Sequence, residues 1–402
     1  MNHPFSERDG VLVVGGTTIA RLADRAGRTP FFAYDRAAID ARVRALRDAL
    51  PPGVLLHYSI KANPMPAVVH HLSTRIDGFD VASAAEMALA LDAGMPADQI
   101  GFAGPGKGSD ELRRAVASGV NIHVESITQL HLVTALGWEL GVQPNIAIRI
   151  NPDFHVGHSG MRMGGGAAAF GVDVEQVPAL LHELDARDAV LAGFHVFWGS
   201  QCLHAPTVIQ AQRQSADLVM KLAAERSVAP RFVNLGGGFG IPYFPGETPL
   251  ELGAVAEAMG SWLPQFTKSL PGTCLILELG RYLVGEAGIY VCRVIDRKIS
   301  RGQTFLVTDG GLHHHLAASG NFGQVLRRNF PVMLGNRLAE APGARCQIVG
   351  CLCTPLDRIA DDVPLPDAHI GDLVVVLQSG AYGCSASPSS FLGHPHAIEM
   401  LV

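Results

Sequence analysis

A lysine at position 61 ends a run of strand-forming residues, and its amine is a candidate nucleophile. The run "HYSIKANP" covers residues 57–64 and is closed by Asn63-Pro64. Lysine is usually exposed, so the local sequence alone favours a surface side chain whose stem packs on apolar neighbours. A desolvated lysine amine, in contrast, attacks aldehydes. Residues elsewhere in the chain decide between these two interpretations.

Polar residues or glycines also end five further β-rich runs. The carboxyl ends of parallel barrel strands meet at one face, where chemistry collects. One polar strand end is ordinary, but this convergence indicates a shared site. The residues are Asp80, followed by Ser83 and Glu86; Arg149 and Asn151; His195 and Ser200; Gly236, Gly237 and Gly238; and Glu278 with Arg281.

The glycine run "NLGGGFG" (234–240) allows backbone N–H groups to approach an anion such as a phosphate. A tight turn after a strand explains the same glycines equally well. The run is not a dinucleotide fingerprint, because Ile241 stands where the last glycine is needed. "GFAGPGKG" (101–108) lacks the Ser or Thr of a nucleotide-binding loop, which argues against a nucleotide there.

A reactive lysine, a phosphate cradle and an acid on a neighbouring strand together predict pyridoxal phosphate. Lys61 would hold the cofactor covalently, and Glu278 would pair with the pyridine nitrogen and keep it protonated. A salt bridge between Glu278 and Arg281, and a structural core histidine at 195, are the alternatives. Asp80 and Arg149 complete the predicted site, His195 would stack on the ring, and Ser200, Arg281 and the glycines would hold the phosphate.

Short β-rich runs alternate with helical runs over the first two thirds of the chain. Most of these runs lack strict polar alternation, as expected of strands buried on both faces. Eight such runs with crossovers predict a closed (β/α)8 barrel, with an open doubly wound sheet as the alternative. The expected strands are 54–60, 76–81, 100–104, 121–125, 145–150, 191–198, 231–235 and 274–279.

The pattern changes after about residue 282, where strand-like runs follow one another without long helices. This predicts a second, mostly antiparallel β domain of the barrel or sandwich type. The strand-like N-terminal run beginning at Val11 is a candidate to join it. We therefore expect a barrel over 31–280 and a β domain formed by 1–30 and 281–402.

Composition excludes several functional classes. The 402 residues are 48% hydrophobic and 17% charged, with a net charge of −6 and no long basic run, so nucleic acid is not an expected partner. No segment approaches the length of a membrane span, and the N-terminus lacks the apolar core of a signal peptide. Seven scattered cysteines fit a reducing cytoplasm.

The ordered set of motifs resembles the fold-type III pyridoxal-phosphate decarboxylases, the group of diaminopimelate, ornithine and biosynthetic arginine decarboxylases. The resemblance covers nearly the whole chain. No single motif is specific, but their order is. The matching segments are "YSIKANP", "FDVASAAE", "FHVFWGSQ", "NLGGGFG", "ELGRYLV", "VGCLCTPLD" and "SGAYG".

The resemblance implies an amino-acid decarboxylase that forms a head-to-tail homodimer with shared active sites. Cys353 would reach the partner's site and return a proton to the substrate α-carbon, and Tyr382 would contact the phosphate. Cys351 fits a small buried hydrophobe better. An amino-acid racemase is one alternative, although Glu278 argues against the weaker electron sink it needs. A non-catalytic regulator that kept the fold is the other.

Two departures from the family bear on the substrate. The related enzymes carry Glu or Asp after the cysteine, facing the distal amine of the substrate, whereas this chain has Thr354. An arginine that diaminopimelate enzymes tend to have after the "DGG" strand end is replaced near Ala317. Free diaminopimelate, ornithine and arginine are therefore disfavoured substrates.

The segments "HHHLAASGNFGQVLRRNFPV" and "GCLCTPLDRI" look most like a branch that includes exosortase-associated decarboxylases of exopolysaccharide gene regions. The branch is also similar to decarboxylases of glutamyl groups on an acyl carrier protein. We expect residues 313–315, three histidines, to lie on a strand with alternating directions, which disfavours one shared metal ion. Arg327-Arg328 would meet an acidic substrate or the phosphopantetheine of a carrier, or would form a solvated pair.

Overall fold

The computed structural model describes residues 3–154, 157, 161–162, 164–226, 229–324 and 326–402. The chain divides into two compact units. One comprises 43–241 and 248–280, and the other comprises 1–42, 242–247 and 281–402. The domain bounds expected from the sequence stay a prediction. Among the described residues, no helix is both long and apolar enough to cross a membrane.

The first unit is a closed parallel barrel, as predicted. Its strands follow the order β9-β12-β14-β15-β5-β6-β7-β8, and β8 pairs again with β9 to close the ring. The open-sheet alternative is therefore wrong. The strands are β5 (Val54–Ser59), β6 (Gly78–Val81), β7 (Ile100–Phe102), β8 (Asn121–Val124), β9 (Asn145–Asn151), β12 (Val190–Val196), β14 (Phe232–Asn234) and β15 (Cys274–Leu279).

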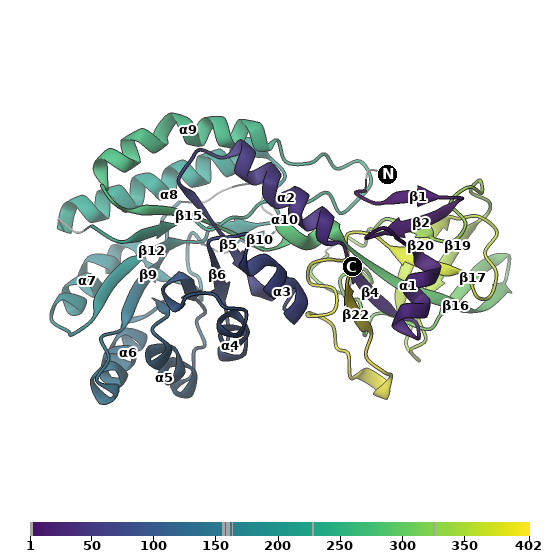
Figure 1. The fold of residues 1–402 in the computed structure, drawn as a ribbon, viewed down its shortest axis with the longest axis horizontal. Helices are drawn as coiled ribbons and strands as arrows, with labels where there is room; N and C mark the ends of the chain where they lie inside the picture. Colours follow the sequence, from purple (N-terminus) through teal and green to yellow (C-terminus); the bar gives the residue numbers. More distant parts are fainter. Residues whose placement is uncertain (1–2, 155–156, 158–160, 163, 227–228, 325) are drawn as a thin grey trace. The chain divides into compact units, whose positions relative to one another are not determined.

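Helices cover the outer face of the barrel strands (Figure 1). Local signals set their ends: the Ser83 and Ser126 hydroxyls accept hydrogen bonds from the first turns of α4 and α6, and Gly119 ends α5 at φ +75°. The helices are α2 (Arg36–Ala49), α3 (Pro66–Ser73), α4 (Ala84–Asp92), α5 (Ser109–Ser118), α6 (Ile127–Leu140), α7 (Val177–Asp185), α8 (Ala205–Arg226) and α9 (Leu252–Ser269).

The second unit is built on a mixed sheet in which most pairings are antiparallel, as expected. Parallel pairings join β17 to β19 and β4 to β22. The N-terminal segment belongs to this unit, since β4 pairs with β16. The sheet strands are β4 (Phe31–Tyr34), β16 (Gly288–Ser300), β17 (Gln303–Thr308), β18 (Val332–Leu334), β19 (Arg345–Val349), β20 (Arg358–Pro364), β21 (Leu373–Val376) and β22 (Ile398–Leu401).

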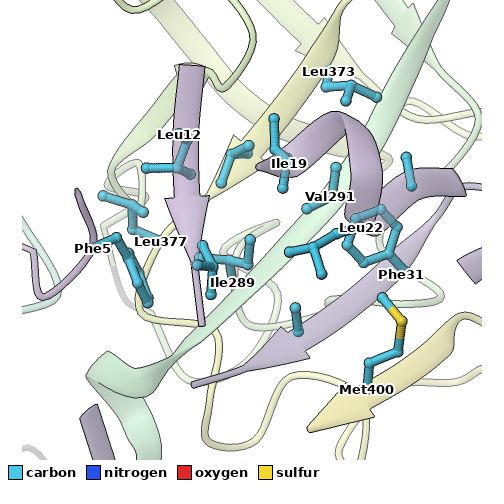
Figure 2. Packing of buried hydrophobic residues seen from close by; sticks show 14 residues of the cluster. Phe5, Leu12, Ile19, Leu22, Phe31, Ile289, Val291, Leu373, Leu377 and Met400 are labelled. Carbon is cyan, nitrogen blue, oxygen red and sulfur yellow. The ribbon is translucent and has the colours of Figure 1, made fainter. Parts of the chain in front are cut away.

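An apolar core holds this second unit together. In Figure 2, side chains from the N-terminal segment interdigitate with those of β16 and the C-terminal strands. Leu12 comes from β2 (Val11–Val14) and Leu22 from α1 (Ile19–Ala26), and both are fully buried. Burial of such side chains contributes about 1.5–3 kcal/mol each. Residues 5–34 are therefore part of this β unit in packing as well as in pairing.

The expectation that residues 313–315 lie on a strand is wrong. Strand β17 ends at Thr308, and the three histidines occupy a turn. The amides of His314 and His315 both donate to the Gly311 carbonyl, at 3.0 and 3.1 Å. The turn hydrogen bonds replace those of a sheet. The glycines before the histidines are required by close packing, since a Cβ would lie 2.0 Å from the Tyr290 hydroxyl at Gly310 and 2.1 Å from Asp357 Oδ1 at Gly311.

Candidate active site

Lys61 lies on a 3-10 turn, η1 (Ile60–Ala62), directly after β5. Asn63 closes the turn: its amide donates to the Ile60 carbonyl at 3.0 Å, and its side-chain oxygen accepts from the Met65 amide at 3.1 Å. The Lys61 amine is 4.0 Å from Glu278 Oε1 and 5.5 Å from the centre of the Phe197 ring. The side chain is half exposed, at the carboxyl end of the strand.

Glu278 is a buried carboxylate on β15. The Ser59 hydroxyl donates to its Oε1 at 2.8 Å, and His195 Nε2 lies 3.2 Å from its Oε2. Burial alone would raise the pKa of Glu278, but the adjacent His195 imidazole, the Lys61 charge and the Ser59 hydroxyl outweigh it. The pKa of Glu278 is therefore held well below its ordinary value, and the group is an anion at neutral pH.

His195 is almost completely buried inside the barrel. Besides Glu278, it meets His123, with the two Nδ1 atoms 2.9 Å apart. Burial, and then the neighbouring His195, lower the pKa of His123 well below its ordinary value. Neutral His123 can therefore share one proton with His195. These contacts leave the predicted stacking role of His195 as a prediction.

Asp80 ends β6 close to the same carboxylate. His57 Nδ1 lies 3.2 Å from Asp80 Oδ2, and the Asn234 amide donates to Oδ1 at 3.5 Å. Burial, and then the negative charge of Glu278, raise the pKa of Asp80. Two buried acids in neighbouring positions thus have their pKa values shifted in opposite directions, a pattern typical of functional sites.

Arg149 is buried at the end of β9 and already has a carboxylate partner. Its Nη1 donates to Glu125 Oε1 at 2.9 Å, and Glu125 also accepts from the amides of Gly104 and Gly171. Lys107 lies beside them, 4.0 Å from Glu125, and burial lowers its pKa to about 8. Arg149 lines the site. Its contact with a cofactor stays a prediction.

A cavity of about 240 Å³ opens where these groups meet. Its wall includes Lys61, Asp80, Arg149 and Glu278, which are predicted site residues from four different strands. Of the predicted residues in the barrel unit, these four therefore come together at the carboxyl ends. A larger cavity, of about 410 Å³, lies at the opposite ends of the strands, where Leu55 and Asp98 stand among its walls.

The predicted glycines follow β14 and pack against backbone. Gly236 and Gly238 have φ values of +65° and +77°, which favour glycine. A Cβ on Gly237 would lie 1.9 Å from the Glu278 carbonyl oxygen. The segment also pairs with the loop that follows Ser200, where the Cys202 amide donates to the Gly238 carbonyl at 2.9 Å. The glycines are thus required by close approach of chains, whether or not a phosphate binds.

Three further predicted residues belong to the second unit. Arg281, at the start of α10 (Arg281–Val284), donates from Nη1 to the Tyr243 hydroxyl at 2.7 Å. Its guanidinium lies 4.8 Å from the centre of the Tyr382 ring, and Tyr382 has a strained φ of +55°. Cys353 is exposed on the loop after β19, whereas Cys351 is half buried there.

The residues present fit a pyridoxal phosphate. In the barrel unit, the buried Glu278 Oε2 lies 3.2 Å from His195 Nε2 but makes no aligned hydrogen bond with a described residue. In the second unit, the buried Arg281 Nε is likewise without a described partner. Buried polar groups are nearly always paired. An acceptor that can meet a pyridinium N–H, and a donor that can meet a phosphate, are therefore both available.

Several functional neighbours were not predicted from the sequence. Ser59, His57, His123 and Glu125 contact the predicted groups, and Phe197 is the half-exposed ring near Lys61. His57, Ser59 and Lys61 alternate along one segment, so period-two spacing was the available signal. His123 and Glu125 are separated from Arg149 and His195 by whole helices, so no local pattern connects them.

Comparisons with known proteins match the chain to one family. Residues 36–285 match the model of the pyridoxal binding domain of pyridoxal-dependent decarboxylases. The chain is 39% identical over 380 residues to the L-glutamyl-[BtrI acyl-carrier protein] decarboxylase of Niallia circulans, covering 93% of this chain and 88% of the relative. It is 31% identical to the diaminopimelate decarboxylase of Pseudomonas aeruginosa, covering 99% and 93%.

The fold is shared with a solved relative. The crystal structure of Helicobacter pylori diaminopimelate decarboxylase with L-lysine superposes at a TM-score of 0.84 and 26% identity, covering 95% of this chain and 94% of that one. The family resemblance, the cofactor and the reaction class expected from the sequence are thereby confirmed. The chain belongs to the pyridoxal-dependent decarboxylases and is a pyridoxal-phosphate-dependent carboxy-lyase acting on amino acids.

Proposed function

We propose that this decarboxylase acts on an amino acid whose distal end carries no free ammonium group, and that a glutamyl group on an acyl carrier protein is its substrate. Thr354 carries the proposal. The related enzymes were expected to place a carboxylate after the cysteine, but Thr354 offers a neutral hydroxyl that accepts from the Leu356 amide at 3.3 Å. The 39% identity to a carrier-linked glutamyl decarboxylase supports the same assignment.

The absence of a carboxylate at position 354 determines how strongly the enzyme should discriminate against free diamino acids. A hydrogen bond to a charged group contributes about 1.5–3 kcal/mol. A free diamino acid would lose that interaction at its distal amine, which corresponds to roughly 10-fold to 150-fold in kcat/KM. A tethered glutamyl group has no such amine and loses nothing.

A substrate panel tests the assignment. Carbon dioxide release and product mass are measured with glutamyl-loaded carrier protein, free L-glutamate, diaminopimelate, ornithine and arginine. We expect turnover of the loaded carrier, and Thr354→Glu should raise kcat/KM for free diaminopimelate while lowering it for the carrier. Thr354→Val is the matched control that restores no charge. Efficient turnover of free diaminopimelate or ornithine by the unmodified enzyme would overturn the proposal.

The barrel unit would supply the catalytic groups. When bound, pyridoxal phosphate supplies an electron sink for the charge left at the α-carbon as carbon dioxide departs. We assign the covalent anchor to Lys61, and the partner of the ring nitrogen to Glu278, whose carboxylate stays ionised. Ser59 and His195 hold Glu278 in position, and Asp80 lies close enough for the charge of Glu278 to raise its pKa. The roles predicted for Arg149, Ser200, the three glycines, Arg281 and Tyr382 stay predictions.

We propose that Phe197, rather than His195, stacks on the pyridine ring of the cofactor. His195 is 1% exposed and lies between Glu278 and His123, whereas Phe197 is half buried and its ring faces the Lys61 amine. A flat apolar face beside the anchor suits stacking on an aromatic ring. His195 would then act on the cofactor through Glu278 alone.

We also propose a homodimer in which Cys353 serves the partner's site as the proton donor to the α-carbon. Large apolar side chains are exposed on loops near Cys353, which supports an interface. Asn321 donates to the Leu356 carbonyl, so two of these loops are adjacent. The exposed side chains in this unit include Phe322, Leu326, Leu356, Phe391 and Leu392.

Subunit mixing tests the shared site. Lys61→Ala and Cys353→Ala homodimers should each be nearly inactive. After exchange at equal concentrations, half of the dimers are mixed, and each contains one intact site, so about a quarter of the original activity should return. No recovery after subunit exchange has been verified would refute the sharing. Cys384→Ala, a half-buried cysteine of the same unit, is the control.

We also propose that the protein works in the cytoplasm. All seven cysteines are free in the structure, which supports a reducing compartment such as the cytoplasm. Arg327 pairs with Asp361 at 3.1 Å and Arg328 with Glu247 at 3.0 Å, so both arginines have carboxylate partners within the protein. Contact with an acidic substrate or a phosphopantetheine stays a prediction. An association with exopolysaccharide synthesis stays a prediction.

A further inference from the structure

Three metal-ligating side chains from distant segments meet in the second unit. His313 lies in the turn after β17, Cys351 on the loop after β19, and His394 just before β22. One ligand atom from each lies within 4.8 Å of the other two. Cys351 Sγ is 3.8 Å from His394 Nδ1, and the rings of His313 and His394 are 5.2 Å apart between centres.

His313 is the unusual member of this cluster. It is completely buried, yet neither of its ring nitrogens has a hydrogen-bond partner among the described residues. Buried histidines are normally paired, and its two neighbours are: His314 Nε2 contacts the Pro395 carbonyl at 2.8 Å, and His315 Nε2 contacts the Ser379 hydroxyl at 2.9 Å. The His313 ring nitrogens are therefore available to a ligand that the described residues do not supply.

The two ligand-bearing loops are held side by side by one carboxylate. Asp357 accepts from the Leu312 amide at 2.6 Å and from the Leu352 amide at 2.8 Å. These amides belong to the residues next to His313 and Cys351. Both Asp357 oxygens accept hydrogen bonds from backbone amides, so the carboxylate positions the two loops. The two histidines and the thiol remain as the possible ligands of an ion.

We propose that His313, Cys351 and His394 bind a zinc ion through two imidazoles and one thiolate. Zinc takes nitrogen and sulfur ligands at about 2.0–2.1 and 2.3 Å in a tetrahedron, which places its ligand atoms about 3.3–3.6 Å apart. The 3.8 Å separation of Cys351 Sγ from His394 Nδ1 is already close to this value. Small side-chain rotations would bring in His313.

Three protein ligands leave a fourth position. His313 is buried, but Cys351 and His394 are half exposed, so the fourth position is accessible to water or a small exogenous ligand. On binding, the Cys351 thiol loses its proton to solvent and the zinc–sulfur bond forms, with no change of oxidation state. The ion would tie the loop that carries Cys353 to the C-terminal segment.

Metal content and X-ray absorption test the site in the cofactor-loaded enzyme. The enzyme is incubated with Zn²⁺, dialysed, and measured for zinc per chain and for the ligands around zinc. We expect about one zinc per chain, with one sulfur at about 2.3 Å and nitrogens at about 2.0–2.1 Å. Cys351→Ser should remove the sulfur and weaken zinc binding by about 100-fold or more.

Controls separate the site from adventitious binding. Cys384→Ser and His369→Gln change a cysteine and a histidine of the same unit outside the cluster, and should keep full zinc content. Co²⁺ added to the unmodified enzyme should give the intense visible bands of a tetrahedral site, which requires no variant to fold. Zinc that dialyses away, a sulfur retained in Cys351→Ser, or weak octahedral Co²⁺ bands would each overturn the proposal. None of these readouts depends on the proposed substrate.

Discussion

Replacing Gly237 with alanine tests how the barrel positions its central carboxylate. A Cβ at this position would lie 1.9 Å from the Glu278 carbonyl oxygen and 2.9 Å from a methyl group of Leu279. Real Cβ contacts are essentially never shorter than 3.0 Å. Moving from 1.9 to 3.0 Å requires a shift of about 1.1 Å, and no flexible side-chain tip is available to absorb it.

Two consequences follow from that shift. Overpacking against backbone typically costs about 1–3 kcal/mol and occasionally more, and we expect about 3 kcal/mol of unfolding free energy here. The displaced backbone carries the carboxylate proposed to face the cofactor. A misplacement of about 1 Å costs on the order of 100-fold in rate. Gly237→Ala should therefore lose cofactor affinity and activity beyond what its lower stability explains.

The assay compares two chemically identical changes. Unfolding in urea followed by circular dichroism gives the free energy, and an absorbance titration with pyridoxal phosphate gives the cofactor affinity. Gly260→Ala is the control. Gly260 lies in the interior of α9, and its added Cβ would be 3.9 Å from Pro51, so the substitution should stabilise the protein by about 1 kcal/mol. Equal free energies and equal cofactor affinities for the two variants would refute the packing argument.

Three other outcomes are expected. Borohydride reduction should leave the cofactor attached to the peptide containing Lys61, and Lys61→Ala should abolish the labelling; a label on another lysine would refute the anchor. Phe197→Ala should weaken pyridoxal phosphate binding about 2-fold to 12-fold, the value of an aromatic pair of about 0.5–1.5 kcal/mol; unchanged affinity would remove its stacking role. The pKa of Lys107 falls from 10.5 unfolded to about 8 folded, so the unfolded chain binds more protons between these values and stability should rise with pH there. The gain relative to Lys107→Met should approach about 3 kcal/mol by pH 10.5 in urea unfolding, and parallel pH profiles would contradict it.

Much of the barrel was readable along the chain. Runs such as 145–150 and 274–279 are short, apolar and bounded by turn residues, which is how strands buried on both faces appear. Their polar carboxyl ends then indicated a common site, because parallel strands in a barrel all end at one face. The strand predicted for residues 313–315 is wrong because β17 ends at Thr308 and the next residues pack against Tyr290 and Asp357, a long-range contact that hydrophobic patterning does not detect.

Individual residues of the site could be predicted from the sequence, but the contacts between them could not. Lys61 and Glu278 could be named from motifs, but their partners could not. Glu125 pairs with Arg149 between adjacent strands, and His123 with His195 between strands separated by one, at sequence separations of 24 and 72 residues. Such contacts depend on strand order and stagger, which no window of sequence contains.

Sequence by itself determined the chemistry this protein has available: a lysine, an acid and glycines at strand ends, and a threonine where related enzymes use an acid. Tertiary structure alone decided which groups share a charge or a proton. Burial opposes ionisation of Glu278, but His195, Lys61 and Ser59 hold it as an anion. Burial and the charge of Glu278 raise the pKa of Asp80, because desolvation and neighbouring charges act through space. The same closure of distant segments brought His313 to Cys351 and His394.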